Sequence, residues 1–392
     1  MRILHTSDWH LGRSFHRVGM LDHQAGYVDH LLDVVDRERV DLVVVSGDVY
    51  DRALPPVDAV RLFDEALARL AASRAVVVVS SGNHDSAQRL GFGSRVMDAA
   101  GVHVRTDLAG VGRPVVVEDA HGPVAVHALP YLDPEAVREP WGLLHRSHEV
   151  ALGEAMSRVR ADLAGRSAAR SVVLAHAFVA GVRARVEPSD SERDISVGGV
   201  SVVPTSLFDG IDYVALGHLH GPHTLTDRVR YSGSPLAYSF SERHQVKGSW
   251  LVDLGRSGNV RAEFVEAPVP RPLVRLEGPL DRLLADADLA RHEASWVQAV
   301  LTDDVRPVQA MERLRRRFPH ALSLSFAPSS GLVPAVPRAR VEGRTDHQVT
   351  LDFVRDLRGG DATEEESALL RTAVDACCHD ADLDPAGAGG PG

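Results

Sequence analysis

Cysteine is nearly absent from this chain: among 392 residues only Cys377 and Cys378 occur, and they are adjacent. Adjacent cysteines form a strained disulfide at best, so the sequence holds no disulfide framework like that of small secreted domains. No basic stretch followed by an apolar run opens the chain, so no secretory signal is visible. We therefore expect a protein of the reducing cytoplasm.

Long apolar runs and lysine are also scarce. The longest apolar runs, such as Leu42–Val45 and Ala75–Val79, are strand-sized, far short of the ~20 residues that cross a bilayer, so we expect no membrane contact. Lys247 is the single lysine, which we interpret as a compositional bias. The net charge of −11 disfavours a protein that coats nucleic acid by charge alone. Local grip on a phosphate chain, or binding through metal ions, stays open.

The length of the chain exceeds what one compact core usually holds, so we expect several structural units. A cluster of prolines near residue 270 marks the change from a large first unit, 1–270, to a small α+β module, 271–327. A Pro/Ser/Gly-rich linker, 328–344, then leads to two helices in 345–378. The Ala/Gly/Pro-rich tail, 379–392, is expected to be disordered.

Strands alternate with helices in the first unit, which indicates an α/β sandwich. Five short Val/Ile/Leu-rich runs are apolar enough to be strands buried on both faces: Ile3–Thr6, Leu42–Ser46, Val76–Ser80, Val172–Ala175 and Tyr213–Leu216. Gln24–Arg37 and Val57–Leu70 have the 3.6-residue period of amphipathic helices. Further strands are expected in a second sheet, at Val102–Val104, Val115–Glu118, Val124–Leu129, Arg230–Ser232 and Trp250–Leu254.

A metal-ligating or acid/base side chain follows each of the five buried runs. In chain order these residues are Asp8, His10, Asp48, Asp51, Asn83, His84, Asp85, His176, His218 and His220. Sites in α/β sheets lie beyond the carboxyl ends of the strands, so we expect the residues to converge on one edge. Asp8 and His10 are two apart in what reads as an extended segment, which predicts that both point to one side, and His218 and His220 share this spacing.

Carboxylates, imidazoles and an amide together suit Mn, Fe or Zn better than Mg or Ca. The set is too large for one ion and fits two that share a carboxylate, the usual apparatus for attacking a phosphate ester. Most other histidines are expected to be structural. His5 on the first strand is interpreted as a hydrogen-bonded core residue, whereas His127 and His223 stay open as residues lining the site. One such motif occurs by chance, but five in this order do not fit a purely structural interpretation.

The series Asp8-x-His10, Gly47-Asp48-x-x-Asp51, Gly82-Asn83-His84-Asp85, His176 and Gly217-His218-x-His220 resembles the calcineurin-like metallophosphoesterase superfamily. In finer detail, His5–Gly12, Asp212–His220, Tyr231–Pro235 and the module containing Phe318-Pro319-His320 are similar to the bacterial Mre-type DNA repair nucleases. The resemblance implies a four-layer α/β/β/α sandwich with a small α+β capping domain and C-terminal helices.

The resemblance also implies a role for each matching position. One ion would be held by Asp8, His10 and His220, the other by Asn83, His176 and His218, and Asp48 would bridge them. His84 would stabilise the transition state or protonate the leaving oxygen. Asp51 resembles the carboxylate that orients this histidine, with Asp85 as the alternative. Arg52 is a candidate phosphate contact, with a surface salt bridge as the alternative.

By resemblance the activity is that of a Mn-dependent DNA nuclease, a double-strand 3′–5′ exonuclease and single-strand or hairpin endonuclease, in DNA repair, replication and recombination. The partner implied is an SMC-like ATPase bound by the apolar stripe of the helices in 345–378, within a heterotetramer built on a homodimer. No Gly-x-x-x-x-Gly-Lys-Ser/Thr motif occurs in the chain itself. Arg313 and Arg315–Arg317 form a basic cluster that is either a DNA contact or a solvated helix face.

Two competing interpretations remain. A phosphatase or cyclic-nucleotide phosphodiesterase would use the same site, but it would not need the capping module or the docking helices. A non-catalytic binding protein would not need a complete ligand set together with His84.

Overall fold

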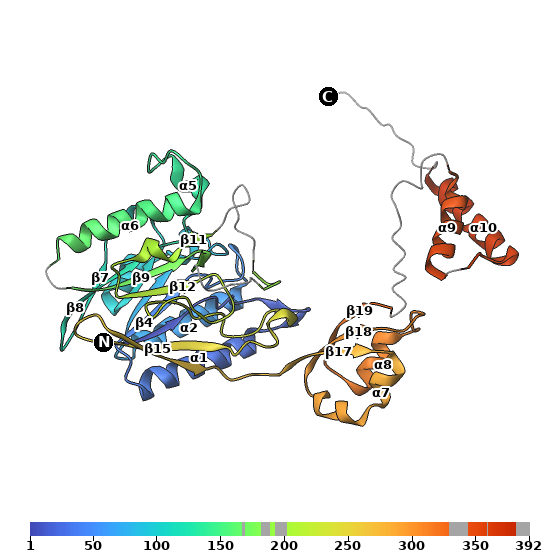
Figure 1. Cartoon of the computed structure of the whole chain (residues 1–392), viewed down its shortest axis with the longest axis horizontal. Helices are drawn as coiled ribbons and strands as arrows, with labels where there is room; N and C mark the ends of the chain where they lie inside the picture. The colour runs from blue at the N-terminus through green and yellow to red at the C-terminus, as the bar shows by residue number, and fades with distance from the viewer. Residues whose placement is uncertain (167–168, 182–188, 193–201, 329–343, 359, 382–392) are drawn as a thin grey trace, which may run out of the picture. The chain divides into compact units, whose positions relative to one another are not determined.

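The structure, a computed structural model, describes residues 1–166, 169–181, 189–192, 202–328, 344–358 and 360–381. The chain divides into two compact units, Met1–Leu273 and Val274–Gly392 (Figure 1). The domain boundaries expected from the sequence stay predictions, and most of the expected linker and tail lies outside the described residues.

The first sheet of the first unit carries three of the five site-bearing strands. Its strand order is β16 (Val260–Glu266), β15 (Gly248–Leu254), β1 (Arg2–Thr6), β4 (Leu42–Ser46), β5 (Val76–Ser80) and β6 (Val102–Arg105). β1, β4, β5 and β6 are parallel, whereas β15 runs antiparallel to β1 and to β16. The helices α1 (Leu21–Arg37) and α2 (Val57–Ala71) pack their apolar stripes on its outer face.

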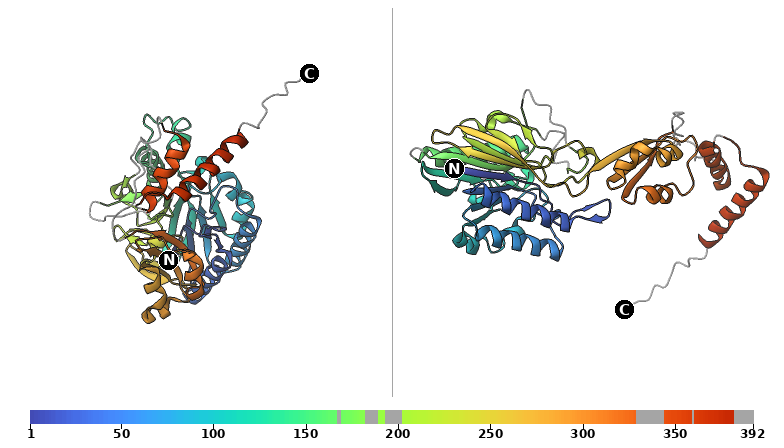
Figure 2. Two further views of the ribbon diagram at one scale, coloured as in Figure 1. Left: turned by 90° about the vertical axis from the view of Figure 1, so that its right-hand side faces the viewer. Right: turned by 90° about the horizontal axis from the view of Figure 1, so that it is seen from below.

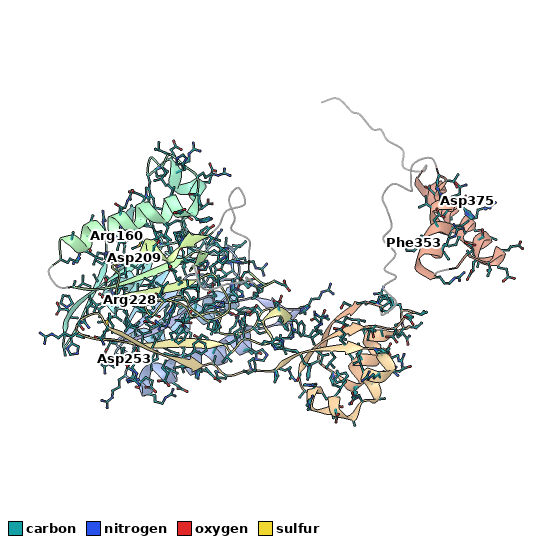
Figure 3. All side chains as sticks on the ribbon, viewed as in Figure 1. Arg160, Asp209, Arg228, Asp253, Phe353 and Asp375 are labelled. Atoms are coloured by element: carbon teal, nitrogen blue, oxygen red, sulfur yellow. The ribbon has the colours of Figure 1, made fainter. Side chains whose placement is uncertain are left out.

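The second sheet carries the other two site-bearing strands. Its order is β13 (His223–Thr224), β14 (Val229–Tyr231), β12 (Tyr213–Gly217), β9 (Arg170–His176), β8 (Gly122–Ala128) and β7 (Val115–Asp119). The helices α5 (Pro134–Arg138) and α6 (His148–Ala164) cover its outer face. Arg160 of α6 donates to the carbonyl of Leu207 at 2.6 Å, beside the labelled Asp209 (Figure 3).

The two sheets pack face to face through apolar residues that point inward from both, including Leu42 and Val44 from β4, and Val172 and Leu174 from β9. The valine-rich runs form strands because each is covered on both faces, by a helix outside and by the other sheet inside. The layers are therefore α/β/β/α, as expected, with the blue helices on one side and the green helices on the other (Figures 1 and 2).

One part of the expected topology was wrong. Val102–Val104 and Trp250–Leu254 are not in the second sheet, because β6 pairs in parallel with β5, and β15 returns antiparallel beside β1. The site-bearing strands are conversely divided, since β9 and β12 belong to the second sheet. The site thus forms where the carboxyl ends of strands from two sheets meet, and Ser46 at the end of β4 donates to the carbonyl of Ala215 on β12 at 2.9 Å.

Short elements complete the first unit. They are the strands β2 (Ser14–Phe15), β3 (Val18–Gly19), β10 (Val179–Ala180) and β11 (Val203–Pro204), the helices α3 (Ala87–Leu90) and α4 (Ser94–Met97), and 3₁₀ turns at Asp98–Ala100, Leu108–Gly110, Thr205–Phe208 and Phe240–Glu242.

The second unit holds a three-stranded sheet of order β17 (Leu273–Gly278), β18 (Trp296–Leu301) and β19 (Ala321–Phe326). The helix α7 (Leu280–Ala285), a 3₁₀ turn (Ala287–His292) and α8 (Ala310–Arg317) belong to the same module, whose core includes Leu283, Leu314 and Phe318. α8 begins later than the sequence pattern predicts, because Gln309 before it has a left-handed backbone, with φ of 52°.

Two further helices, α9 (Asp346–Arg358) and α10 (Glu364–Ala381), follow. The side chains of Cys377 and Cys378 lie outside the described residues. Among the helices described, none combines the length and the apolar character needed to span a bilayer.

Candidate metal centre

The backbone leaves the extended conformation directly after β1. Asp8 and His10 both have positive φ, at 53° and 47°. The expectation that an extended segment turns them to one side was therefore wrong. They are brought together because this segment lies along the one after β4: the N–H of Asp8 donates to the carbonyl of Gly47 at 3.1 Å, and that of His10 to the carbonyl of Asp48 at 3.0 Å. A positive φ is costly for a residue other than glycine and persists only where its surroundings hold it.

Asp85 ties together the loops after β4 and β5. Its carboxylate accepts hydrogen bonds from the N–H groups of Val49, Tyr50 and Gly82, at 3.1, 2.9 and 2.9 Å. Gly82 is required at this point, because a Cβ there would stand 2.1 Å from Oδ1 of Asp48. Asp85 therefore positions the loop that carries Asp48 and does not contact the His84 ring.

A first cluster is formed by Asp8, His10 and His220, whose ligand atoms all lie within 4.8 Å of one another, with all three side chains buried. The Nε2 atoms of His10 and His220 are 3.0 Å apart. Burial lowers the pKa of His10 to about 3 and also lowers that of His220, so both rings are neutral at pH 7. Two neutral imidazole nitrogens aimed at each other are a suitable pair of ligands for one cation.

A second cluster contains Asp8, Asp48 and His176. Nδ1 of His176 lies 3.0 Å from the carbonyl oxygen of Ser46, which can only accept, so Nδ1 carries the proton. Nε2 then faces Oδ1 of Asn83 at 2.8 Å and Oδ2 of Asp48 at 3.4 Å. Three acceptor atoms meet there, and they repel one another unless a positive charge lies among them.

The pKa values of this second cluster report the same deficit of positive charge. Burial raises the pKa of Asp8 to about 8. Burial would lower the pKa of His176, but the charge of Asp48 and its hydrogen bond outweigh it and raise that pKa to about 9. Protons thus take the place of a cation in the protein alone. The donor set fits divalent cations, which displace such protons when they bind.

His218 and Asn83 stand beside the second cluster. The rings of His218 and His176 are 5.3 Å apart between centroids, and the N–H of His218 donates to Oδ1 of Asp8 at 3.0 Å. Gly217 lets β12 approach β4 closely, because a Cβ there would stand 1.9 Å from the carbonyl oxygen of Ser46.

A third group, His10, Asp48 and His84, overlaps the other two. His84 is the most exposed histidine of the site, at 9 %. Its Nδ1 lies 2.7 Å from the main-chain carbonyl oxygen of Asp51, so Nδ1 donates, and Nε2 stands 3.9 Å from Oδ2 of Asp48. The ring is therefore oriented by a peptide carbonyl.

The expectation that the carboxylate of Asp51 orients His84 was consequently wrong. That carboxylate lies 3.5 Å from Nδ1 of His10 and 3.4 Å from the guanidinium of Arg13. Burial would raise the pKa of Asp51, but these cationic or hydrogen-bonding neighbours lower it. The next residue, Arg52, has an exposed side chain, and its contact with phosphate stays a prediction.

Other histidines have structural partners. His5 contacts the hydroxyl of Tyr213 at 2.9 Å and the carbonyl of Leu216 at 3.1 Å, which confirms it as a core residue. His127 pairs with Asp162 of α6 at 3.1 Å. Neither His127 nor His223 belongs to the clusters found among the described residues.

Sequence reasoning missed a polar layer behind His220. Ser191, Glu242 and Lys247 are all buried there. They come from separate loops with no common motif, and the rarity of lysine was the one signal that pointed to them.

Comparison with known proteins adds the following similarities. Residues 1–222 match the family model described as calcineurin-like phosphoesterase, and residues 269–353 match one described as type 5 capsule protein repressor C-terminal domain. A Staphylococcus epidermidis protein whose name makes it one of the subunits of the nuclease SbcCD is 28% identical over 328 residues, covering 83% of this chain and 85% of its own. Its namesake in Staphylococcus saprophyticus is 28% identical over 337 residues, covering 83% and 84%.

Among solved structures, one described as a dimetal phosphatase from Danio rerio aligns with 67% of this chain and 98% of its own, at 16% identity and a TM-score of 0.41. The family match spans the strands that end in the clustered aspartates and histidines, and it covers more than half of the sequence. The chain belongs to the calcineurin-like phosphoesterase family.

Proposed function

We propose that this chain is the nuclease component of an SbcCD-type complex, a two-metal phosphodiesterase that hydrolyses DNA. The observation that carries the proposal is the position of Asp48, whose carboxylate belongs to the group with His10 and His84 and also to the cluster with Asp8 and His176. A shared carboxylate is what two adjacent ions require. The names of the Staphylococcus relatives support DNA as the substrate.

In this proposal Asp8, His10 and His220 hold one divalent ion, Asn83, His176 and His218 hold the other, and Asp48 is shared. Bound ions of this kind supply an activated water and neutralise charge on the phosphoryl oxygens. The mixture of imidazole and carboxylate ligands favours Mn.

His84 is the proposed acid of the reaction. Because its Nδ1 donates to the carbonyl of Asp51, Nε2 is the atom able to hold or release a proton toward the substrate. His84 is also less buried than the ligand histidines, which suits a residue that must meet substrate.

The proposed reactions are 3′–5′ exonucleolytic cutting of duplex ends and endonucleolytic cutting of single strands and hairpins, in DNA repair, replication and recombination. The basic cluster on α8 gives this little support, because its guanidinium groups have partners within the module. Arg313 pairs with Asp281 at 2.5 Å and Arg317 with Glu293 at 3.2 Å. These contacts favour the solvated helix face over a DNA contact.

The proposed partner is an SbcC-type SMC-like ATPase that binds α9 and α10. Phe353 on α9 (Figure 3) and Leu369 on α10 are 53 % and 71 % exposed, which is unusual for large apolar side chains and suits a docking face. A homodimer within a heterotetramer and a cytoplasmic location complete the proposal.

The test is a cleavage assay on linear duplex, hairpin and single-stranded DNA, with Mn or Mg, with and without the ATPase and ATP. Bis-p-nitrophenyl phosphate serves as a small diester control. Mn-dependent DNA cutting that the partner stimulates is expected. Turnover of the small diester with no DNA cutting under any condition would replace the nuclease with a small-molecule phosphodiesterase.

A further inference from the structure

Lys247 is the only lysine of a chain in which 43 residues are lysine or arginine. It is 7 % exposed and lies directly behind the metal centre. Its Nζ donates to Oε2 of Glu242 at 2.5 Å, the carbonyl oxygen of His220 at 2.8 Å, Oε1 of Gln245 at 2.8 Å and Oγ of Ser234 at 3.0 Å. Four acceptors surround one nitrogen, an arrangement made for a point charge.

An arginine would not satisfy this surrounding. The guanidinium group is planar and directs its N–H groups in a fixed fork, whereas an ammonium group rotates its donors about a single atom. A compositional bias that favours arginine at every other cationic position therefore does not explain this lysine. The geometry of its pocket does.

Lys247 is connected to the His220 ring through two side chains. Glu242 is fully buried, and while its Oε2 faces Lys247, its Oε1 accepts the hydroxyl proton of Ser191. Because that proton is used, Oγ of Ser191 accepts from Nδ1 of His220, at 2.7 Å. Nδ1 thus holds the proton of the neutral ring, and Nε2 presents its lone pair toward Nε2 of His10.

The backbone of His220 is held by charges at both ends. Its N–H donates to Oε1 of Glu192 at 2.6 Å, and its carbonyl accepts from Lys247. Lys247 therefore acts on this one ligand twice, directly at the carbonyl and at the ring through Glu242 and Ser191. Partners behind a ligating histidine fix its tautomer and its orientation.

We propose that Lys247 is a positioning residue of the metal centre, which through Glu242 and Ser191 keeps Nε2 of His220 unprotonated and aimed at the ion that His10 also binds. This inference rests on the metal-binding part of the proposed function.

The first test compares Lys247→Met with the double variant Lys247→Met/Glu242→Gln. The single variant leaves the buried Glu242 charge unpaired and is expected to lose stability, whereas the double variant removes both charges and recovers it. Mn²⁺ binding to the full chain is measured by calorimetric titration. Both variants are expected to bind one Mn²⁺ about 10- to 100-fold more weakly, with the second Mn²⁺ unchanged.

The matched control is Arg170→Met, which also breaks a buried ion pair. Arg170 pairs with Asp119 at 2.5 Å at the start of β9, the end of that strand away from His176. Arg170→Met is expected to lose stability and to keep both Mn²⁺ affinities. Equal loss of Mn²⁺ affinity in the control and in the double variant would reduce Lys247 to a structural role and overturn the proposal.

A spectroscopic test is independent of metal. In the ¹⁵N NMR spectrum of the metal-free protein, His220 is expected to show the Nδ1–H tautomer, and the double variant a mixture of tautomers. Lys247→Arg keeps the charge, and it is expected to show the same mixture because the fork cannot serve all four acceptors. An unchanged tautomer in both variants would contradict the proposal. Failure of the wild-type chain to bind Mn²⁺ would instead refute the proposed function.

Discussion

The two ends of strand β9 (Arg170–His176) show two different ways of burying charge. At its start, Arg170 is bonded to the carboxylate of Asp119 and to the carbonyl of Gly122 at 2.7 Å, so the charges are balanced within the protein. At its end, His176 faces the acceptors of Asn83 and Asp48, which the protein leaves without a balancing cation. A balanced buried cluster supports the fold, whereas an unbalanced one indicates a site that completes itself with a ligand.

Backbone conformation differs in the same direction. Four non-glycine residues of the site, Asp8, His10, Asp48 and His218, have positive φ, from 47° to 105°. The start of β9 is regular strand, paired in register with β8 and β12. Strain of this kind, held in place by packed sheets, is typical of functional positions.

The largest effect that separates the two ends is expected from Asp48→Asn. The amide oxygen can still accept the N–H of His84, which now lies 2.8 Å from Oδ1, so the fold is preserved. The shared charge is lost, and because each bound ion contributes several kcal/mol to the transition state, phosphodiester hydrolysis falls by at least about 10⁴-fold. The measurement is kcat/KM on DNA and on bis-p-nitrophenyl phosphate. Arg170→Met is the control, and its retained activity per folded molecule is part of the prediction.

His84→Ala is expected to have the next largest effect. Loss of the proton at Nε2 reduces kcat about 10²- to 10⁴-fold on DNA, while Mn²⁺ binding is kept because His84 is not an essential ligand. Metal content and cleavage rate are measured on the same preparation. Normal cleavage by this variant would refute the assigned mechanism.

A smaller effect is expected in the pH dependence of stability. Without metal, the pKa of His176 is raised from 6.5 to about 9 and that of Asp8 from 3.8 to about 8. Groups with a raised pKa in the folded state stabilise it at low pH, and this contribution is lost as the pH rises through the folded-state pKa. The low pKa of Asp48 acts in the opposite sense, but below pH 3.8. Thermal melts in a chelator should therefore show Tm falling from about pH 6.5 to 9, and Mn²⁺ should remove most of that slope. Identical slopes with and without Mn²⁺ would contradict this prediction.

The smallest effect is expected far from the site, on α8. Arg316 is 73 % exposed and pairs with Glu312 one helical turn away, at 2.9 Å. Such a pair contributes less than about 1 kcal/mol, so Arg316→Ala should change neither Tm nor the KM for DNA appreciably. A several-fold rise in KM at low salt would restore the cluster as a DNA contact.

The sequence was sufficient to predict the strands and the residues at their ends, because buried valine-rich runs and the polar residues after them are local patterns. The division of those strands between two sheets was not predictable in the same way, since pairing partners are distant in the chain. Nor was the left-handed backbone of Asp8 and His10, because a spacing of two residues fits an extended segment equally well.

The role of Asp51 shows a different limit. Its position three residues after Asp48 was recognised, but the atom that holds His84 is its main-chain oxygen, which no side-chain pattern reveals. The layer of Ser191, Glu242 and Lys247 arises from tertiary contacts between loops, and only the composition hinted at it.

The central claim is that the unbalanced end of the sheets holds two divalent ions with Asp48 between them. Its most direct test is the number of Mn²⁺ ions bound per chain at equilibrium, read together with the electron paramagnetic resonance spectrum of the loaded protein. The account predicts two ions per wild-type chain with the exchange coupling of an adjacent pair, and loss of that coupling in Asp48→Asn. A single uncoupled ion, or none, in the wild-type chain would contradict it.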